Sequence, residues 1–277
     1  DKIEKYMPSS IPLYDNKNLN PYRLLNQIGE NEDNDPIHYA KSAINKIKFN
    51  KNHEIGTHTF SHYNCLAQGQ NTKDFNADLI AAKKIANDMG IEVKSIVFPK
   101  NEVNSKYLTV CKNNGITNYR GTENHFLYNP NLNRKKKHFA LFHRALRLVD
   151  GYFNISGYNT YSIKNLKLDE SGLINLPSSR FLRPFMPHLS FLEFLKRRRI
   201  KKAMHYAAAN NELFHLWWHP HNFGANMDEN FKNLESIFIE YNLLNKKYQF
   251  ESITMTGLAN KILEKPISNN NLWGKNF

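Results

Sequence analysis

The chain has 277 residues, of which 40% are hydrophobic and 13% aromatic, enough for one large α/β domain with its own core. It contains no run of eighteen apolar residues and no leader-like segment, so we predict neither a membrane span nor export, and we expect a cytoplasmic protein. The net charge of +13 indicates either an acidic partner, such as a phospholipid surface, a phosphate-bearing carrier or nucleic acid, or a composition biased toward Asn and Lys. Two cysteines are too few to staple such a fold, which favours reduced thiols.

The first half of the chain alternates between predicted helices and strands. Residues 1–35 are polar and turn-rich, and we expect an irregular surface excursion there. Apolar residues at helical spacing predict helices over 37–49 and 72–89, the second ending at Gly90, and Asn104 caps a third helix that stops near Gly115. Strands are predicted at 54–57, 91–98 and 116–120. This alternation predicts parallel strands with helices outside.

The middle of the chain, residues 121–211, is less regular and is interpreted as a basic insertion. It holds the run Arg134–Lys137 and a predicted amphipathic helix, Leu189–Ala209, which carries the basic cluster Lys196–Lys202. Two interpretations of this helix stay open. It either lies on an anionic membrane surface or carrier lipid, or it is an ordinary packing helix with a solvated basic face.

Regularity returns toward the end of the chain. Residues 212–218 are predicted as an apolar strand leading into the sequence HPHNFG, 228–244 as a helix, 250–255 as a last strand, and a short helix follows from Thr256. No internal repeat interrupts this pattern. We therefore predict one α/β domain over residues 1–277.

Two histidines four residues apart, His58 and His62, form the most informative motif. If the backbone turns helically after Gly56, both imidazoles lie on one side, where two neutral nitrogens suit zinc. Such pairs also occur by chance on solvated helices, and a third protein ligand and a water are still needed. The preceding apolar residues favour the metal interpretation, because they place the pair at the carboxyl end of a strand, where α/β enzymes keep their sites.

Polar side chains follow the other predicted strands as well. In a barrel of parallel strands these positions meet on one face, which is the main argument for an enzyme. The positions concerned are Pro99-Lys100-Asn101, Tyr119-Arg120, His219-Pro220-His221 and Thr254-Met255-Thr256. Trp217, His219 and His221 alternate along a strand and its exit, so they point the same way. A histidine beside a metal can protonate a leaving amine.

The segment HEIGTHTFSH resembles the second motif of the polysaccharide deacetylases, the NodB-homology or carbohydrate esterase family 4 enzymes. The resemblance implies that His58 and His62 are ligands of a catalytic divalent metal, for which zinc is expected, and that Thr59 shapes the loop. HLWWHPH is similar to the family's late motif, which makes His219 the expected catalytic acid and His221 the second choice. The implied fold is a distorted, incomplete (β/α) barrel.

Further residues are expected to bind substrate. FPKN occupies the place of the family's arginine-proline motif, with Lys100 and Asn101 as the matching positions, although a lysine offers a point charge where the family has a bidentate fork. We expect Arg120, and Arg180 or Arg183, to hold substrate hydroxyls or phosphates. Surface arginines are also common without such a role. Either Trp217 or Trp218 is expected to wall the acetyl pocket.

The family's first motif, a Thr-Phe-Asp-Asp-Gly strand end, has no counterpart here. It supplies one Asp as general base and another as third metal ligand, yet the sequence contains no Asp-Asp pair, and Asp15, Asp33 and Asp35 follow no apolar strand. Either the chain has lost its catalytic carboxylates and is a binding relic, or the printed sequence starts after the first strand and its motif. The second explanation is favoured, since the later strands and helices are present.

The resulting hypothesis is a metal-dependent hydrolase that removes N-acetyl groups from amino sugars of a cell-surface polysaccharide or its precursor. Its partners would be an N-acetylated saccharide and, peripherally, an anionic membrane or carrier lipid. The alternatives are a non-catalytic carbohydrate-binding relic of the same fold and another metal-dependent amidase. Nucleic-acid binding is disfavoured, because no recognition motif or aromatic platform accompanies the basic residues.

Overall fold

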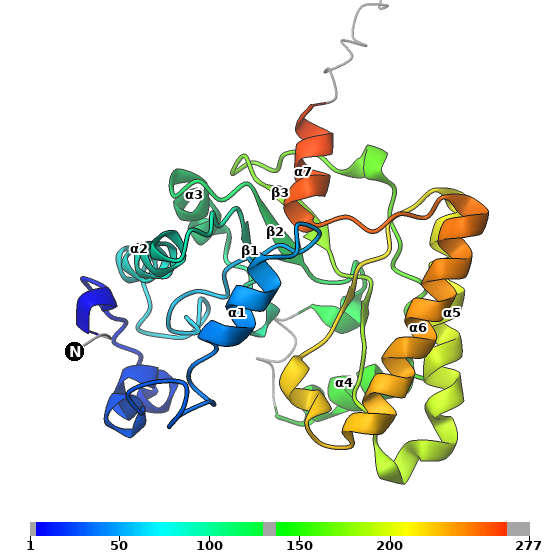
Figure 1. The fold of residues 1–277 in the computed structure, drawn as a ribbon, viewed down its shortest axis with the longest axis horizontal. Coiled ribbons are helices and arrows are strands. Elements are labelled where there is room, and N and C mark those ends of the chain that lie inside the picture. The colour runs from blue at the N-terminus through cyan, green and yellow to red at the C-terminus, as the bar shows by residue number, and fades with distance from the viewer. Residues whose placement is uncertain (1–3, 130–136, 265–277) are drawn as a thin grey trace, which may run out of the picture.

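Short parallel strands form the centre of the molecule, as Figure 1 shows for the computed structural model, which describes residues 4–129 and 137–264. One sheet has the order β1-β2-β3, and a second pairs β4 with β5, all in parallel. The strands are β1 (Ser95–Ile96), β2 (Asn118–Gly121), β3 (Ile174–Pro177), β4 (Arg180–Phe181) and β5 (Leu216–Trp217). Thr57 adds a single parallel bridge to Ile96 on the outer side of β1.

The two sheets are joined by the extended segment that contains both β3 and β4. Within the link, the Ser178 amide donates to the Gly121 carbonyl beside β2, whereas the Ser179 amide donates to the His215 carbonyl beside β5. The order across the centre is therefore Thr57, β1, β2, the β3–β4 segment and β5. The α/β class is confirmed, and among the described residues this row of strands does not close into a barrel.

A groove of about 890 Å³ separates the two ends of this row. Thr57 and His58 line it from one end, and Leu213, Leu216 and Trp218 line it from the other. The residues that precede and begin the last helix, 250–255, also border this groove. The gap thus lies where a further strand would join the two edges.

Helices pack near both ends of the row of strands. In Figure 1, α2 lies beside α3, and α5 lies beside α6. The helices are α1 (Lys41–Lys48), α2 (Thr72–Asp88), α3 (Ser105–Asn113), α4 (Lys137–Asp150), α5 (Glu193–Asn210), α6 (Met227–Tyr248) and α7 (Met255–Leu263). Side chains cap several of them: Asn71 accepts from the Asp74 amide, Asn104 from the Lys106 amide. No helix in the described ranges is long and apolar enough to cross a membrane.

Three clusters of apolar side chains make the core. The largest packs α2 and α3 against β1 and β2 through aromatic residues such as Phe75, Phe98 and Tyr107, and it contains both free cysteines. A second cluster lies between α5, α6 and the β4–β5 pair, and a third joins α7 to β3. Each large side chain buried in this way stabilises the fold by about 1.5–3 kcal/mol.

The structure corrects several expected strands. Of residues 54–57 only Thr57 pairs, and 91–98 contributes only Ser95–Ile96. Residues 250–255 form no ladder, because no neighbouring strand lies beside them in the described chain, and Thr254 instead caps α7 by accepting from the Gly257 amide. The segment 121–211 is no mere insertion, since it contributes β3 and β4. Within it, residues 130–136, and with them most of the run Arg134–Lys137, lie outside the described residues.

The basic cluster 196–202 does not present one continuous cationic face. Lys196 is buried and pairs with Glu193, and Arg199 is buried against Asp150. Two of the six basic side chains in this cluster are therefore buried inside the protein, which favours the interpretation of α5 as a packing helix.

Candidate functional site

The loop that holds the two histidines is not helical. Thr59 and His62 both have positive φ, at 67° and 54°, so the expected helical turn after Gly56 is wrong. The hydroxyl of Thr57 instead accepts from the Thr59 amide at 3.0 Å, and the Thr59 hydroxyl accepts from the Tyr63 amide at 2.8 Å. This loop still brings the rings of His58 and His62 to 5.0 Å between centroids.

A buried carboxylate from α2, Asp78, fixes the same loop. Its oxygens accept from the backbone amides of Phe60 at 2.7 Å and Ser61 at 3.1 Å, and also from the Ser61 hydroxyl. Burial raises the pKa of Asp78, and these hydrogen bonds partly offset the rise. Sequence reasoning missed this residue, although a carboxylate one turn after Phe75 on an apolar helix face was a usable signal.

The histidine pair meets two requirements of metal ligands. His58 Nδ1 lies 2.7 Å from the Val97 carbonyl oxygen, which can only accept, so Nδ1 carries the proton and Nε2 keeps its lone pair. Desolvation lowers the pKa of both rings, and the positive charge of Lys100 lowers that of His62 further. Both imidazoles are therefore neutral at pH 7, the form that binds a metal.

The remaining metal ligands are not found near this pair. In the part of the chain that the structure describes, no group of three or more His, Cys, Asp or Glu side chains could hold a metal ion. The two histidines thus fit the nitrogen half of a zinc site, and the oxygen half is not supplied by residues 4–129 or 137–264.

His219 approaches the pair from the end of β5. Its ring stacks on His221 at 5.0 Å and meets Trp217 edge-on at 5.4 Å. Partial burial lowers the pKa of His219, and His221, Arg120 and His62 lower it further, in that order. His58 and His62, which follow the Thr57 bridge, therefore lie close to Arg120 near the carboxyl end of β2 and to His219 after β5. His221 lies one step outside, in the turn Pro220–Phe223.

Arg120 connects this histidine group to the residues after β1. Its Nη2 donates to Asn101 Oδ1 at 2.7 Å, and its guanidinium lies 4.3 Å from the centre of the Trp217 ring. Burial lowers the pKa of Arg120 to about 10, so the group stays charged at neutral pH. Lys100 and Asn101 both have positive φ, which turns the chain sharply after Pro99.

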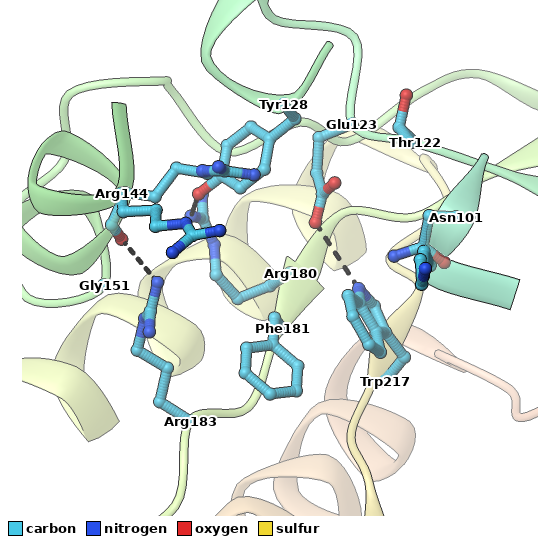
Figure 2. Close-up of a pocket in the computed structure, with 12 residues that line it drawn as sticks. Asn101, Thr122, Glu123, Tyr128, Arg144, Gly151, Arg180, Phe181, Arg183 and Trp217 are labelled. Carbon is cyan, nitrogen blue, oxygen red and sulfur yellow. Dashed lines mark hydrogen bonds between the residues drawn. The ribbon is translucent and has the colours of Figure 1, made fainter. Parts of the chain in front are cut away.

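A cavity of about 380 Å³ lies beside Arg120 and is shown in Figure 2. We call it the arginine pocket. The side chains that line it are Lys100, Asn101, Thr122, Glu123, Tyr128, Arg144, Arg147, Arg180, Phe181, Arg183 and Trp217, together with Gly151. Trp217 donates its indole N–H to Glu123 at 3.4 Å, whereas Trp218 stacks on Phe223 and faces the groove. Only the first of the two expected tryptophans walls this pocket.

Arg180 was expected to bind substrate, but most of its guanidinium group is used in contacts within the protein. It is 3% exposed, and its Nη1 pairs with Asp150 at 2.6 Å. Its Nη2 donates to the Gly157 carbonyl at 3.0 Å. Arg183 is half-buried, and its Nη2 donates to the Arg147 carbonyl at 3.0 Å, so only part of its guanidinium group is used in this hydrogen bond. Sequence reasoning missed Glu123, Arg144 and Arg147, the last two because no helix was predicted over 137–150.

Comparisons of the chain with models of known protein families, with curated proteins and with solved structures find no match, so what this site does rests on its own geometry.

Proposed function

We propose that the chain forms most of a metal-dependent hydrolase that removes N-acetyl groups from amino sugars of a cell-surface polysaccharide or its precursor. The observation that carries this proposal is the pair His58 and His62, with rings 5.0 Å apart at a strand end and His58 Nδ1 held by the Val97 carbonyl. The finer fold that the proposal requires is an incomplete (β/α) barrel of the NodB-homology type.

In this proposal His58 and His62 hold a divalent metal, with zinc favoured by their imidazole nitrogens. The third ligand is a carboxylate from a segment outside the described residues. The groove between Thr57 and β5 supports this, because a strand placed there would end beside the histidines. When bound, such a metal polarises the acetyl carbonyl and activates a water.

The chain's own residues have separate tasks around this centre. Arg120, held by Asn101 and Trp217, keeps a positive charge at the strand ends, where it can orient a sugar hydroxyl or the carbonyl oxygen. His219 is neutral at pH 7, so it must first take up a proton before it can give one to the leaving amine. Trp217 forms one wall of the adjoining pocket.

The test compares metal content and acetate release in the native protein, produced with any sequence that precedes Asp1, and in the His58→Ala/His62→Ala variant. We expect near-stoichiometric zinc and acetate release from an N-acetylated oligosaccharide, both lost in the variant. His188→Ala, which changes an exposed histidine elsewhere, serves as the matched control and should keep both. Native protein that binds no metal after reloading with zinc or cobalt and releases no acetate contradicts the proposal.

A non-catalytic carbohydrate-binding relic is the second candidate. The specific observation that favours it is the lack of a third metal-binding side chain among the described residues. The two candidates separate in the same experiment: a relic binds an N-acetylated oligosaccharide with equal affinity before and after treatment with a chelator. Another metal-dependent amidase would release acetate only from small amides.

A further inference from the structure

The arginine pocket carries an excess of positive charge. Among the described residues, five cationic side chains line it, and Glu123 is the only carboxylic acid. Burial raises the pKa of Glu123, and one carboxyl group cannot balance five cationic side chains in either protonation state. Figure 2 shows Arg144, Arg180 and Arg183 along one side of the pocket, with Asn101 and Trp217 on the other.

Three of these five cations have no carboxylate partner among the described residues. Arg180, by contrast, is paired with Asp150, which it shares with Arg199. Lys100, Arg144 and Arg183 form no carboxylate ion pair within the described ranges. Burying part of a guanidinium without an anion is costly, so Arg183 would be stabilised by an anion, which residues 4–129 and 137–264 do not supply.

The local packing holds Arg183 in place. Its guanidinium lies 5.8 Å from the Phe181 ring, and Nη2 donates to the Arg147 carbonyl. Gly151 makes room for it, because a Cβ at that position would lie 3.0 Å from the Arg183 Cδ and Nε atoms. Arg147 also lowers the pKa of Arg183, in addition to the larger effect of burial. Several like charges are therefore kept close together.

The pocket adjoins the histidine group through shared residues. Lys100 lines the pocket, and its charge also acts on His62. Asn101 and Trp217 line the pocket as well, and both contact Arg120. A substrate bound at the histidines could therefore also place one of its groups in the arginine pocket.

We propose that the arginine pocket binds a phosphate or diphosphate group of the substrate, so that the molecule deacetylated is a phosphorylated N-acetylated amino sugar. The inference rests on the proposed function for the identity of the reaction, but the anion site stands on the pocket alone. Arginine forks match phosphate oxygens in pairs, and a group with two or more negative charges balances cations that a single carboxylate would leave uncompensated.

The first experiment measures binding of inorganic pyrophosphate by calorimetry at fixed ionic strength, without reference to catalysis. Arg183→Gln and Arg144→Gln are compared with Arg198→Gln, which removes the same charge from an exposed position on α5. We expect affinity to fall about tenfold in Arg183→Gln, several-fold in Arg144→Gln, and less than about twofold in Arg198→Gln. Because Arg144 is exposed, its variant keeps the test valid if Arg183→Gln folds poorly.

The second experiment compares kcat/KM for a nucleoside diphosphate-linked N-acetylated sugar, an isoprenyl diphosphate-linked sugar in detergent, and an uncharged N-acetylated oligosaccharide. The native protein should prefer a diphosphate substrate, and Arg144→Gln should reduce that preference about as much as it weakens pyrophosphate binding. Preference between the first two substrates tells a soluble donor from a lipid carrier.

The outcomes separate the two proposals. If no sugar is deacetylated but pyrophosphate binding depends on Arg144 and Arg183, the proposed function fails and the anion site stands. If pyrophosphate does not bind, or if Arg198→Gln weakens it as much as the pocket variants do, the anion site is overturned whatever the activity.

Discussion

Arg180 and Arg199 form one group of arginines and Arg144 and Arg183 form another, and the surroundings of the two groups differ sharply. In the buried group, Arg180 and Arg199 share the carboxylate of Asp150, with which they form ion pairs of 2.6 and 2.8 Å. In the arginine pocket, Arg183 and Arg144 have no carboxylate partner within the described chain. Arg180 and Arg183 are only three residues apart. Their positions in the sequence therefore do not show that Arg180 forms a buried ion pair and that Arg183 has no carboxylate partner among the described residues.

The buried group is a network with most of its hydrogen-bonding capacity used. Asp150 also accepts from the Tyr128 hydroxyl at 2.5 Å and from the Ser156 amide at 2.7 Å. Burial by itself would raise the pKa of Asp150, but the hydrogen bond from Tyr128 and the charge of Arg180 lead the effects that bring it down to about 2. A carboxylate with such a pKa stays ionised in the folded protein at any ordinary pH.

The largest effect is expected from Asp150→Asn. This change keeps the shape of the side chain but leaves two buried guanidinium groups without a counter-charge, which should lower the free energy of unfolding by about 3–5 kcal/mol. Urea denaturation measures the loss. Glu123→Gln is the matched control, because Glu123 is also buried but forms no ion pair with any described residue, and the change should cost less than about 1 kcal/mol. If both variants lost the same free energy of unfolding, the ion pairs of Asp150 would not set the buried group apart from the arginine pocket.

The pH dependence of stability should carry the signature of Asp150. The folded pKa of about 2 lies below the ordinary value of 3.8, so the stabilisation is fully present above the unfolded pKa and is lost as pH falls from about 5 through 2. The loss should reach about 2 kcal/mol. Unfolding measured at several pH values should show this slope in the native chain and a smaller one in Asp150→Asn, and parallel curves would contradict the assignment.

A smaller effect is expected from Arg183→Gln. The variant loses one hydrogen bond to the Arg147 carbonyl and its contact with Phe181, which should cost about 1 kcal/mol. Native protein should also gain thermal stability when pyrophosphate is added, because a ligand that binds only the folded state stabilises it. Thermal unfolding with and without pyrophosphate measures both quantities, and Arg183→Gln should lose most of the gain.

The contrast between the two groups also shows what the sequence was able to predict. The helices over α2, α3 and α6 followed from apolar spacing and from caps such as Asn104, because these signals are local. The proximity of His58 and His62 was also expected, although the loop depends on Asp78, which lies 17 residues after Ser61 and acts through tertiary contact. Asp150 meets Arg180 and Arg199 across 30 and 49 residues, so no short pattern indicated which arginine would be buried.

Strands were the least predictable elements for the same reason. The segment 250–255 has the composition of a strand, but a strand exists only where a neighbour offers hydrogen bonds, and none of the described strands pairs with it. The segment from β3 to β4 was placed in an insertion, yet it pairs with β2 through Ser178 and with β5 through Ser179.

The smallest effect on stability should come from Arg144→Gln, and it is the sharpest test of the comparison. Arg144 is exposed on α4. Burial lowers the pKa of Arg147, and the positive charge of Arg144 lowers it further. Removing a charge that repels its neighbours should change the free energy of unfolding by less than about 0.5 kcal/mol, and the sign should be stabilising at low salt. Urea denaturation at two salt concentrations measures this. If the variant weakens pyrophosphate binding but hardly changes stability, Arg144 serves ligand binding. A clear loss of stability would instead show that Arg144 supports the fold, as the buried group around Asp150 does.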